Sequence, residues 1–358
     1  MEIKSPSIGT KEKGELKSLK QDLFGENIFD VCESKNIDDE VEKLFKYFRK
    51  VGFPHYDIKD YCKNNELEKL KNFNEKEILV GNDIKQTMHS LGFLWCYFPN
   101  WVDVTYKNQE QGLLELWNND EKLKTLIKKT YKWQLKFGNG VFTINRLRQN
   151  AKIYLSKQSV SNFRPTASKY FYNTYGNNGV VWDMSSGWGG RLFGFLSSNC
   201  NTYIGTEPCR KTYNGLIKLK ESYKKENKKV EIYNLCAENY IPNKNSVDLC
   251  FTSPPYFDCE RYSKEKTQSY IKYPTKELWI DDFLRRMIKN CHYSLKENGY
   301  MILNIANTSH HKWIEDSVLD VCGEENFKLV KMNYLILSSV SGKGVKREPI
   351  FIYKKETK

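Results

Sequence analysis

The sequence predicts an α/β fold in which a parallel sheet is covered by crossover helices and preceded by a helical region. From about residue 160 onward, short apolar runs alternate with stretches of helical length, which is the pattern of strand–helix–strand units. Before that point, apolar residues recur at helical spacing. The chain of 358 residues is also long enough for two domains.

The first 155 residues are predicted to be mainly helical. Residues 1–25 are polar and lysine-rich, and we expect them to form a flexible tail. Next, Val41, Leu44, Phe45 and Phe48 follow the spacing i, i+3, i+4 and i+7, which places them on one face of a helix. We therefore assign residues 26–155 to a mainly helical domain.

Two features of this helical region have more than one interpretation. Residues 91–101 read LGFLWCYFPNW, the most aromatic stretch of the chain, which favours the core of the helical domain, with a base-stacking surface as the alternative. Arg146, Arg148 and Lys152 cluster near the end of the domain. They fit either phosphate contacts or a solvated helix face.

The remaining part, residues 156–358, is predicted to contain the sheet. The segments between its strands have helical lengths, at residues 191–198, 209–227 and 279–295. The expected strands, in chain order, are residues 180–183, 202–206, 230–234, 247–252 and 299–305, with residues 328–337 and 350–354 as a late pair that closes the sheet.

Chemically informative residues follow the first three strands. Asp183 ends the first strand and precedes a glycine-rich loop, SSGWGGR at residues 185–191, where glycines let a ligand approach the backbone and a helix N-terminus offers free N–H groups. Glu207 follows the second strand and Glu238 the third, where acids suit ribose hydroxyls and an exocyclic amine. Because the carboxyl ends of parallel strands meet at one edge, we expect one shared site.

The fourth strand ends abruptly in the sequence TSPPY at residues 252–256. Two prolines stop the strand because neither has an N–H to donate. The Ser253 hydroxyl, the Pro254 carbonyl and the Tyr256 ring then project together, which suits a flat ring that bears an amino group. The hydroxyl and the carbonyl can accept the protons of the amine, and the tyrosine can stack on the ring.

In this combination the chain resembles the amino-group DNA methyltransferases, which use S-adenosylmethionine to methylate N4 of cytosine or N6 of adenine. The TSPPY sequence resembles their motif IV, the glycine loop their motif I, and NFRPTASK at residues 162–169 their motif X. The glycine loop departs from the aromatic-x-Gly-x-Gly run that is frequent in the family. The resemblance covers residues 160–354 and implies a Rossmann-like seven-stranded methyltransferase sheet with an N-terminal helical domain.

The resemblance also implies a cofactor and a set of site residues. Residues 156–358 would form the S-adenosylmethionine-dependent methyltransferase domain, and no metal is implied. The implied catalytic residues are Ser253, Pro254, Pro255 and Tyr256. The residues implied for cofactor binding are Phe163, Arg164, Pro165, Thr166, Asp183, Ser185, Gly187, Trp188, Gly189, Glu207 and Glu238.

The implied reaction is direct methyl transfer to the exocyclic amino group of a base flipped out of double-stranded DNA. Within the family, a serine at the position of Ser253 favours N4 of cytosine, and N6 of adenine is the alternative. RNA bases and protein glutamine are reached through similar motifs on the same fold. From another class, the alternative is a nucleic-acid binding module without catalysis.

The composition bears on partners and location. A net charge of +13 favours a polyanionic partner, so we expect double-stranded DNA, recognised by the helical domain together with residues 257–274. A cognate restriction endonuclease is a second candidate partner.

No apolar run approaches the ~18 residues that span a bilayer, and the ten cysteines form no CxxC pair. We expect a cytoplasmic, DNA-associated protein without a membrane, a zinc site or disulfides, and place His310 and His311 in a surface turn.

Overall fold

The computed structural model describes residues 20–21, 27–30, 36–137, 141–156, 160–224, 226–338 and 345–356. The chain divides into two compact units, one of Met1–Pro54 and Leu116–Leu155 and the other of His55–Glu115 and Ser156–Lys358. Residues 55–115 therefore belong with the sheet, whereas the sequence assigned them to the helical domain. The expected flexible tail, residues 1–25, lies outside the described residues apart from 20 and 21.

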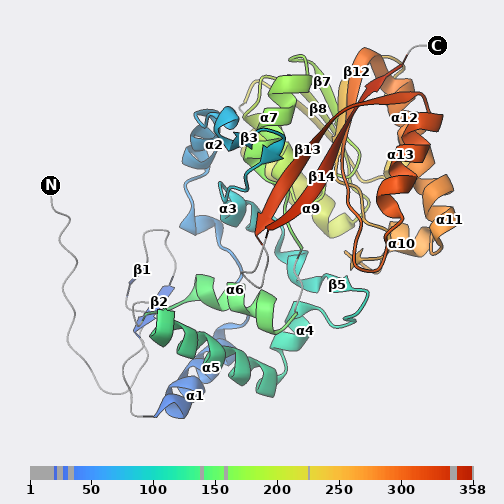
Figure 1. The fold of residues 1–358 in the computed structure, drawn as a ribbon. Helices are drawn as coiled ribbons and strands as arrows, with labels where there is room; N and C mark the ends of the chain where they lie inside the picture. The colour runs from blue at the N-terminus through green and yellow to red at the C-terminus, as the bar shows by residue number, and fades with distance from the viewer. Residues whose placement is uncertain are drawn as a thin grey trace. The chain divides into compact units, whose positions relative to one another are not determined.

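The described part of the N-terminal unit combines helices with a small antiparallel sheet of order β1-β2-β6 (Figure 1). Its elements are β1 (Lys20–Gln21), β2 (Asn27–Asp30), α1 (Ile37–Val51), α5 (Asp120–Phe137), β6 (Val141–Thr143) and α6 (Ile144–Tyr154). Helix α1 begins where Asn36 accepts the N–H of Asp38, and it ends at Gly52, whose φ is 82°. The predicted stripe buries Phe48, which packs against Trp117 at 5.7 Å between ring centroids.

The second unit is organised around a nine-stranded sheet of order β3-β4-β13-β14-β12-β10-β7-β8-β9. Strands β9, β8, β7, β10 and β12 run parallel, and β14 runs antiparallel between β12 and β13. The strands are β3 (Leu79–Val80), β4 (Asp83–Ile84), β7 (Val180–Asp183), β8 (Thr202–Thr206), β9 (Lys229–Tyr233), β10 (Val247–Thr252), β12 (Leu295–Asn304), β13 (Phe327–Ser338) and β14 (Val345–Lys355).

This strand order confirms the predicted α/β class with a Rossmann-like sheet, including the late antiparallel pair. The expected count of seven strands is exceeded by two, because the short hairpin β3–β4 adds to the outer edge of β13. There β4 pairs in parallel with Tyr334 and Leu335. No described helix is both long and apolar enough to cross a bilayer.

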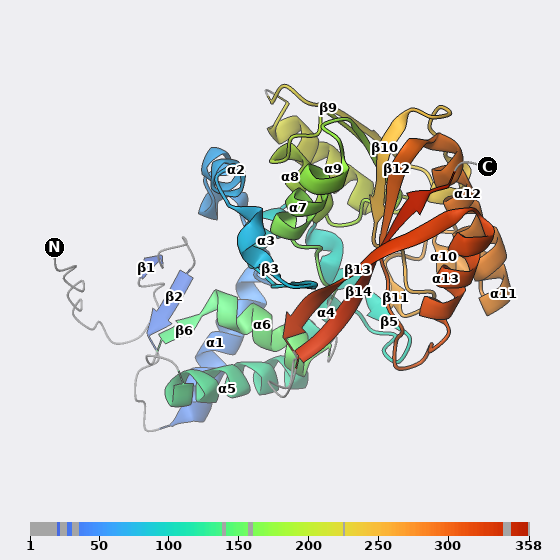
Figure 2. The same ribbon diagram turned by 45° about the horizontal axis from the view of Figure 1, so that its top comes forward.

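Helices cover both faces of the sheet (Figures 1 and 2). One face carries α7 (Pro165–Tyr175), α8 (Gly190–Leu196) and α9 (Arg210–Ser222), and the other carries α12 (Arg285–Ser294) and α13 (Ile314–Glu324). Side chains alternate along β10, so Phe251 packs against Phe171 and Tyr172 of α7, while Cys250 joins the core beneath α12 and α13. The sheet is thus buried on both sides.

Short elements complete the described chain. Helix α4 (Leu113–Trp117) crosses the boundary between the two units. The others, all in the second unit, are η1 (Ile58–Asp60), α2 (Lys63–Lys71), η2 (Glu75–Ile78), α3 (Leu91–Trp95), η3 (Pro99–Asp103), β5 (Thr105–Tyr106), η4 (Ala237–Asn239), β11 (Glu260–Arg261), α10 (Ser269–Lys272), α11 (Lys276–Leu278) and the π-helical turn η5 (Trp279–Leu284).

The aromatic segment of residues 91–101 is core, as its preferred interpretation states, but core of the sheet unit. Phe93 and Phe98 are fully buried. Phe93 packs against Phe193 of α8, and both Trp95 and Phe98 contact Trp188. These rings therefore support the glycine loop from behind, and their burial leaves no base-stacking surface there.

Candidate active site

The sheet reverses its order between β7 and β10. From β7 the chain continues outward through β8 and β9, and it then returns to place β10 and β12 on the other side. In open α/β sheets the crevice at such a reversal, outside the carboxyl ends of the strands, is where ligands bind. A cavity of about 810 Å³ lies at this point and is lined by both the glycine loop and residues 253–256.

Asp183 holds the glycine loop in place through hydrogen bonds. Its Oδ2 accepts hydrogen bonds from Nε of Arg191 and from the hydroxyl of Tyr203, each at 2.8 Å. Its Oδ1 accepts from the Thr252 hydroxyl at 2.9 Å, and that same hydroxyl accepts the N–H of Ser185 at 3.0 Å. Asp183 is 1% exposed and does not line the cavity. It therefore positions the loop and joins it to the end of β10.

Two glycines of the loop have backbone conformations that other residues rarely adopt. The φ angles of Gly187 and Gly189 are 55° and 75°. A Cβ atom on Gly189 would lie 2.9 Å from Leu219 and 3.0 Å from Phe98, too close for real contacts. The bend of the loop into α8 consequently depends on glycine there.

Asn162 holds residues 188–190 of the loop through its side-chain amide. Its Nδ2 donates to the Trp188 carbonyl at 2.8 Å, and its Oδ1 accepts the N–H of Gly190 at 3.1 Å. Asn162 and the neighbouring Phe163 both line the cavity. Asn162 stands in the quoted motif X but was absent from the predicted site residues, because one amide gives no sign of bridging a loop that is 26 residues away.

The other predicted residues of motif X point elsewhere. Arg164 donates to the Asn162 carbonyl at 2.6 Å, Pro165 is the first residue of α7, and the Thr166 hydroxyl shares a hydrogen bond with Thr87 at 2.7 Å. None of the three lines the cavity. They hold the N-terminus of α7 in place behind the loop.

Glu207 lies at the end of β8 with its carboxylate in the cavity wall. One oxygen accepts the N–H of Gly187 at 3.0 Å and the other that of Cys209 at 2.9 Å. Burial raises the pKa of Glu207 to about 7, although these two N–H bonds lower it. Each oxygen keeps a second lone pair for a ligand.

Glu238, after β9, also lines the cavity, and its carboxylate is already partnered. It accepts from the Tyr273 hydroxyl at 2.8 Å and forms an ion pair with Lys272. Both partners come from residues 257–274, for which we expect a part in target recognition. The C-terminal half of that segment packs over the ends of β8 and β9.

Two further contacts fasten this segment. The Thr267 hydroxyl donates to the Pro208 carbonyl at 3.2 Å, and Sγ of Cys236 donates to the Thr267 carbonyl at 3.3 Å. The next residue, Gln268, is 4% exposed and lines the cavity, and its Nε2 has no hydrogen-bond partner among the described residues. The hydrogen-bonding capacity of such a buried N–H group is satisfied only when a ligand or a water molecule accepts from it. No sequence signal singled it out.

The residues of the TSPPY sequence occupy the opposite wall. Ser253, Pro254, Pro255 and Tyr256 all line the cavity, and the Tyr256 hydroxyl donates to the Asn304 carbonyl at 3.3 Å. The next residue, Phe257, has a φ of 57° and is buried against Trp279, His311 and Trp313. The left-handed backbone conformation of Phe257 changes the direction of the chain directly after Tyr256.

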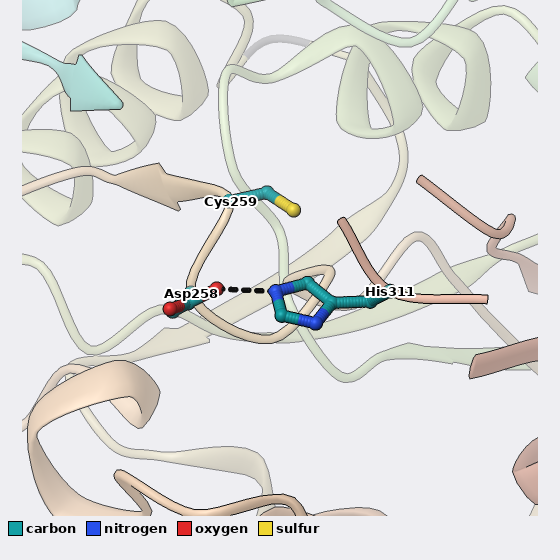
Figure 3. Close-up of side chains that lie close together, drawn as sticks. All are labelled: Asp258, Cys259 and His311. Carbon is teal, nitrogen blue, oxygen red and sulfur yellow. Dashed lines mark hydrogen bonds and ion pairs between the residues drawn. The ribbon is translucent and has the colours of Figure 1, made fainter. Parts of the chain in front are cut away.

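Asp258, Cys259 and His311 cluster beside this wall, with one potential ligand atom from each within 4.8 Å of the others. Figure 3 shows the carboxylate and the imidazole facing each other, with Nε2 of His311 2.6 Å from Oδ1 of Asp258. The Lys107 ammonium lies 2.8 Å from Oδ2. Burial alone would raise the pKa of Asp258, but Lys107 and His311 lower it below its ordinary value.

Lys107 thus already supplies the positive charge that the Asp258 carboxylate requires. The cluster acts as an ion-pair network that joins the end of β5, the turn after Tyr256 and the loop after β12. His311 is 7% exposed, so the expected surface turn is wrong for this residue, because the Asp258 carboxylate accepts a hydrogen bond from its Nε2. His310 is exposed, as expected.

Ten of the fifteen predicted site residues therefore line one cavity, and the other five do not. Those that line the cavity are Phe163, Ser185, Gly187, Trp188, Glu207, Glu238, Ser253, Pro254, Pro255 and Tyr256. Those that do not are Arg164, Pro165, Thr166, Asp183 and Gly189. The second group shapes or supports the first.

Comparisons with known proteins give only remote structural similarities. No family model and no curated protein matches the chain. A SAM-dependent methyltransferase from Methanosarcina mazei is 13% identical, with a TM-score of 0.37 over 50% of this chain and 93% of that one. A SAM-dependent O-methyltransferase from Thermotoga maritima is 12% identical, with 0.38 over 58% and 71%. Magnesium protoporphyrin IX methyltransferase from Synechocystis is 14% identical, with 0.37 over 54% and 78%. These similarities add nothing to what the strand order already shows.

Proposed function

We propose that the protein is an S-adenosylmethionine-dependent methyltransferase that methylates the exocyclic amino group of a base in double-stranded DNA. N4 of cytosine is the proposed target, and N6 of adenine is the alternative. One observation carries the proposal. The glycine loop after β7 and the TSPPY sequence after β10 line the same cavity at the point where the sheet reverses.

The glycine-loop side of the cavity fits the cofactor. The Glu207 carboxylate has free lone pairs for the ribose hydroxyls, and the buried Nε2 of Gln268 has no hydrogen-bond partner among the described residues. Residues 185–188 of the glycine loop line the cavity as well. The cofactor supplies an electrophilic sulfonium methyl group. These residues would hold and orient it so that this group faces the opposite wall.

The opposite wall fits an amine acceptor. An exocyclic amino nitrogen is a poor nucleophile because its lone pair is delocalised into the ring. The Ser253 hydroxyl and the Pro254 carbonyl can accept its two protons, which directs the lone pair toward the methyl group. Tyr256 can stack on the flipped base, whose extrusion costs a few kcal/mol. Catalysis then rests on positioning and electrostatics.

The cysteines of the cavity support direct transfer over attack by a thiolate. Cys236 and Cys259 both line the cavity. Burial raises the pKa of Cys236 to about 11 and also raises that of Cys259. Cys209, which follows a proline as the nucleophile of cytosine-C5 enzymes does, is buried and has a raised pKa for the same reason. Thiols of raised pKa are weak nucleophiles at neutral pH.

The proposal is tested by offering methyl-labelled cofactor with duplex DNA, RNA or protein in separate reactions. We expect label in DNA. Label in RNA or protein alone would replace the DNA assignment with one of the alternative substrates on the same fold. The absence of both transfer and cofactor binding would support a binding module without catalysis.

A first prediction concerns the unpaired amide. Gln268→Leu keeps the approximate size of the side chain and removes its hydrogen-bonding atoms. We expect it to weaken binding of S-adenosylhomocysteine by about 2- to 12-fold, the equivalent of one hydrogen bond at 0.5–1.5 kcal/mol. Isothermal calorimetry measures this directly. The matched control is Gln111→Leu, outside the cavity wall, and equal affinity of both variants would remove Gln268 from the cofactor site.

A second prediction concerns pH. Because the pKa of Glu207 is raised to about 7, its carboxylate is mostly neutral at pH 6 and mostly ionised at pH 8. Ribose hydroxyls donate best to the ionised form, so affinity for S-adenosylhomocysteine should rise by up to roughly tenfold between these values. Calorimetry across this range should give a flat profile for Glu207→Gln. A profile that is unchanged by this substitution would exclude Glu207 as the titrating group.

The same shift affects stability in the opposite sense. A carboxyl group whose pKa is raised on folding contributes stability that is fully present below the ordinary pKa of 4.5 and is lost as the pH rises through about 7. The ligand-free protein should therefore lose stability over the range in which its cofactor affinity increases. Urea unfolding at each pH, with Glu207→Gln as reference, isolates this contribution.

A further inference from the structure

Helices α5 and α6 of the N-terminal unit carry cations that the proposed reaction does not use. Of the three basic residues singled out in the sequence, Arg148 is 3% exposed and its Nε donates to the Pro54 carbonyl at 2.8 Å, so it serves the fold. Arg146 is different. Its guanidinium lies 3.6 Å from the centroid of the Trp133 ring on α5. Stacking of this kind leaves the N–H groups in the guanidinium plane free to donate.

A similar pair follows along the same two helices. The Lys129 ammonium lies 4.7 Å from the centroid of the Tyr154 ring, and Tyr154 is 40% exposed. Lys132 and Lys136 are exposed on successive turns of α5. We define the α5–α6 seam as Lys129, Lys132, Trp133, Lys136, Arg146 and Tyr154.

The four cations of the seam have no carboxylate within 4.0 Å in the part of the chain that the structure describes. Two other lysines of the same helix do have one. Lys124 pairs with Glu42 at 2.8 Å, and Lys128 pairs with Asp38 at 2.6 Å. Lys124 and Lys128, in the N-terminal half of α5, are thus paired within the unit, whereas Lys129, Lys132 and Lys136, in its C-terminal half, form no ion pair with a described carboxylate. Lys132 contributes only at longer range to the positive charge that lowers the pKa of Asp38. Residues 116–155 contain nine Lys and Arg but two Asp and Glu.

We propose that the α5–α6 seam binds the phosphate backbone of double-stranded DNA. The choice of DNA rests on the proposed function, and the anionic nature of the partner rests on the uncompensated charge. A guanidinium held flat on an indole presents its donors in the fork geometry that suits phosphate oxygens. Lys129 and Lys136 are separated by about 10 Å along the helix axis. This span matches about three base-pair steps at 3.4 Å each.

A protein partner fits the seam less well. Protein–protein interfaces are depleted in lysine relative to the rest of the surface, and three of the six seam residues are lysines. Lysines and arginines clustered along a helix are instead the electrostatic footprint of nucleic-acid binding. The N-terminal unit would therefore bind DNA through its phosphate backbone, without contacts to the bases.

The chain offers a closely matched pair of variants. Lys132→Ala/Lys136→Ala removes two unpaired cations of the seam. Lys124→Ala/Lys128→Ala removes two paired cations at the same spacing on the same helix. Binding to a fluorescent duplex of about 24 base pairs is measured by anisotropy from 50 to 200 mM salt. Each lost phosphate contact reduces the slope of log K against log salt by about 0.9.

We expect the seam variant to reduce the slope by about 2 and the control variant by less than half as much. Equal slopes for the two variants and the unmodified protein would overturn the proposal. A seam variant that keeps its slope for duplex DNA and loses it for duplex RNA or single-stranded DNA would overturn the choice of partner. Thermal unfolding by circular dichroism confirms that both variants are folded.

Failure of this proposal is separable from failure of the proposed function. Calorimetry with S-adenosylhomocysteine reports on the cavity, and both variants should bind it with unchanged affinity. If labelled methyl reaches DNA while the seam variant binds DNA as tightly as the unmodified protein, only the seam is wrong. If no label reaches DNA but the salt slope still falls, the seam binds DNA and the substrate assignment is wrong.

Discussion

Replacing Asp183 with asparagine is expected to lower the free energy of unfolding by about 3–5 kcal/mol, because it leaves a buried guanidinium without its counter-charge. Asp183 accepts from Arg191, Tyr203 and Thr252, and Arg191 is 5% exposed. The same carboxylate links the glycine loop to the end of β10, so cofactor binding should be lost as well. Urea unfolding and calorimetry measure the two effects.

Asp248 provides the control for this prediction, since it is a buried carboxylate near the opposite end of β10. Its oxygens accept from the Val180 N–H and from Lys296, whose side chain is 47% exposed. Asp248→Asn leaves a lysine that water can reach, so we expect a loss of about 1–2 kcal/mol and no change in cofactor affinity. Equal losses of stability and affinity for the two variants would contradict the role given to Asp183.

The second large effect is expected at Tyr256. Removal of its ring in Tyr256→Ala should lower kcat/KM for DNA by roughly 5- to 150-fold, which corresponds to about 1–3 kcal/mol of base stacking. Tyr256→Phe keeps the ring and removes the hydroxyl, which donates to the Asn304 carbonyl and also interacts with Ser253 and Glu348, so the stacking contribution to activity should remain. Steady-state methylation of duplex DNA measures both variants.

Calorimetry with S-adenosylhomocysteine separates this effect from a damaged cofactor site. Both Tyr256 variants should bind it with the affinity of the unmodified protein. Activity of Tyr256→Ala close to that of Tyr256→Phe would contradict the stacking role. Loss of cofactor affinity in Tyr256→Ala alone would show that the ring supports the glycine-loop side of the cavity.

The seven strands from β7 to β14 that belong to the large sheet could be predicted from the sequence because their signals are local. Each strand is a short apolar run, and the side chains at positions 183, 207, 238 and 253 follow such runs directly. Parallel strands place their carboxyl ends at one edge, so chain order alone predicted a shared site. The two prolines at residues 254 and 255 also predict where β10 ends, because neither has an N–H to donate.

The domain boundary could not be predicted in this way. Periodicity indicates that a segment has a buried face but does not name the partner of that face. Residues 91–101 have a buried face, and they bury it against Trp188 and Phe193 of the sheet unit. The hairpin β3–β4 is too short to give a strand signal, yet it adds to β13.

Residues that act through distant partners were also missed. His311 can be buried because its Nε2 donates to the Asp258 carboxylate, which lies 53 residues away in sequence. The left-handed backbone of Phe257 follows from the aromatic packing around it, since nothing in a phenylalanine favours a positive φ. Gln268 also has no signal in the sequence, because only the fold places it in the cavity wall with an Nε2 that has no partner among the described residues.

The most direct test of the central claim is nucleoside analysis of duplex DNA after incubation with the protein and a cofactor that carries a deuterated methyl group. We expect a deuterated methyl on N4 of deoxycytidine, identified by mass spectrometry, and none in the reaction of Asp183→Asn. A methyl on N6 of deoxyadenosine would keep the mechanism and change the base. A methyl on carbon 5 of deoxycytidine, or none in DNA while RNA or protein is labelled, would contradict methyl transfer to an amino group of DNA.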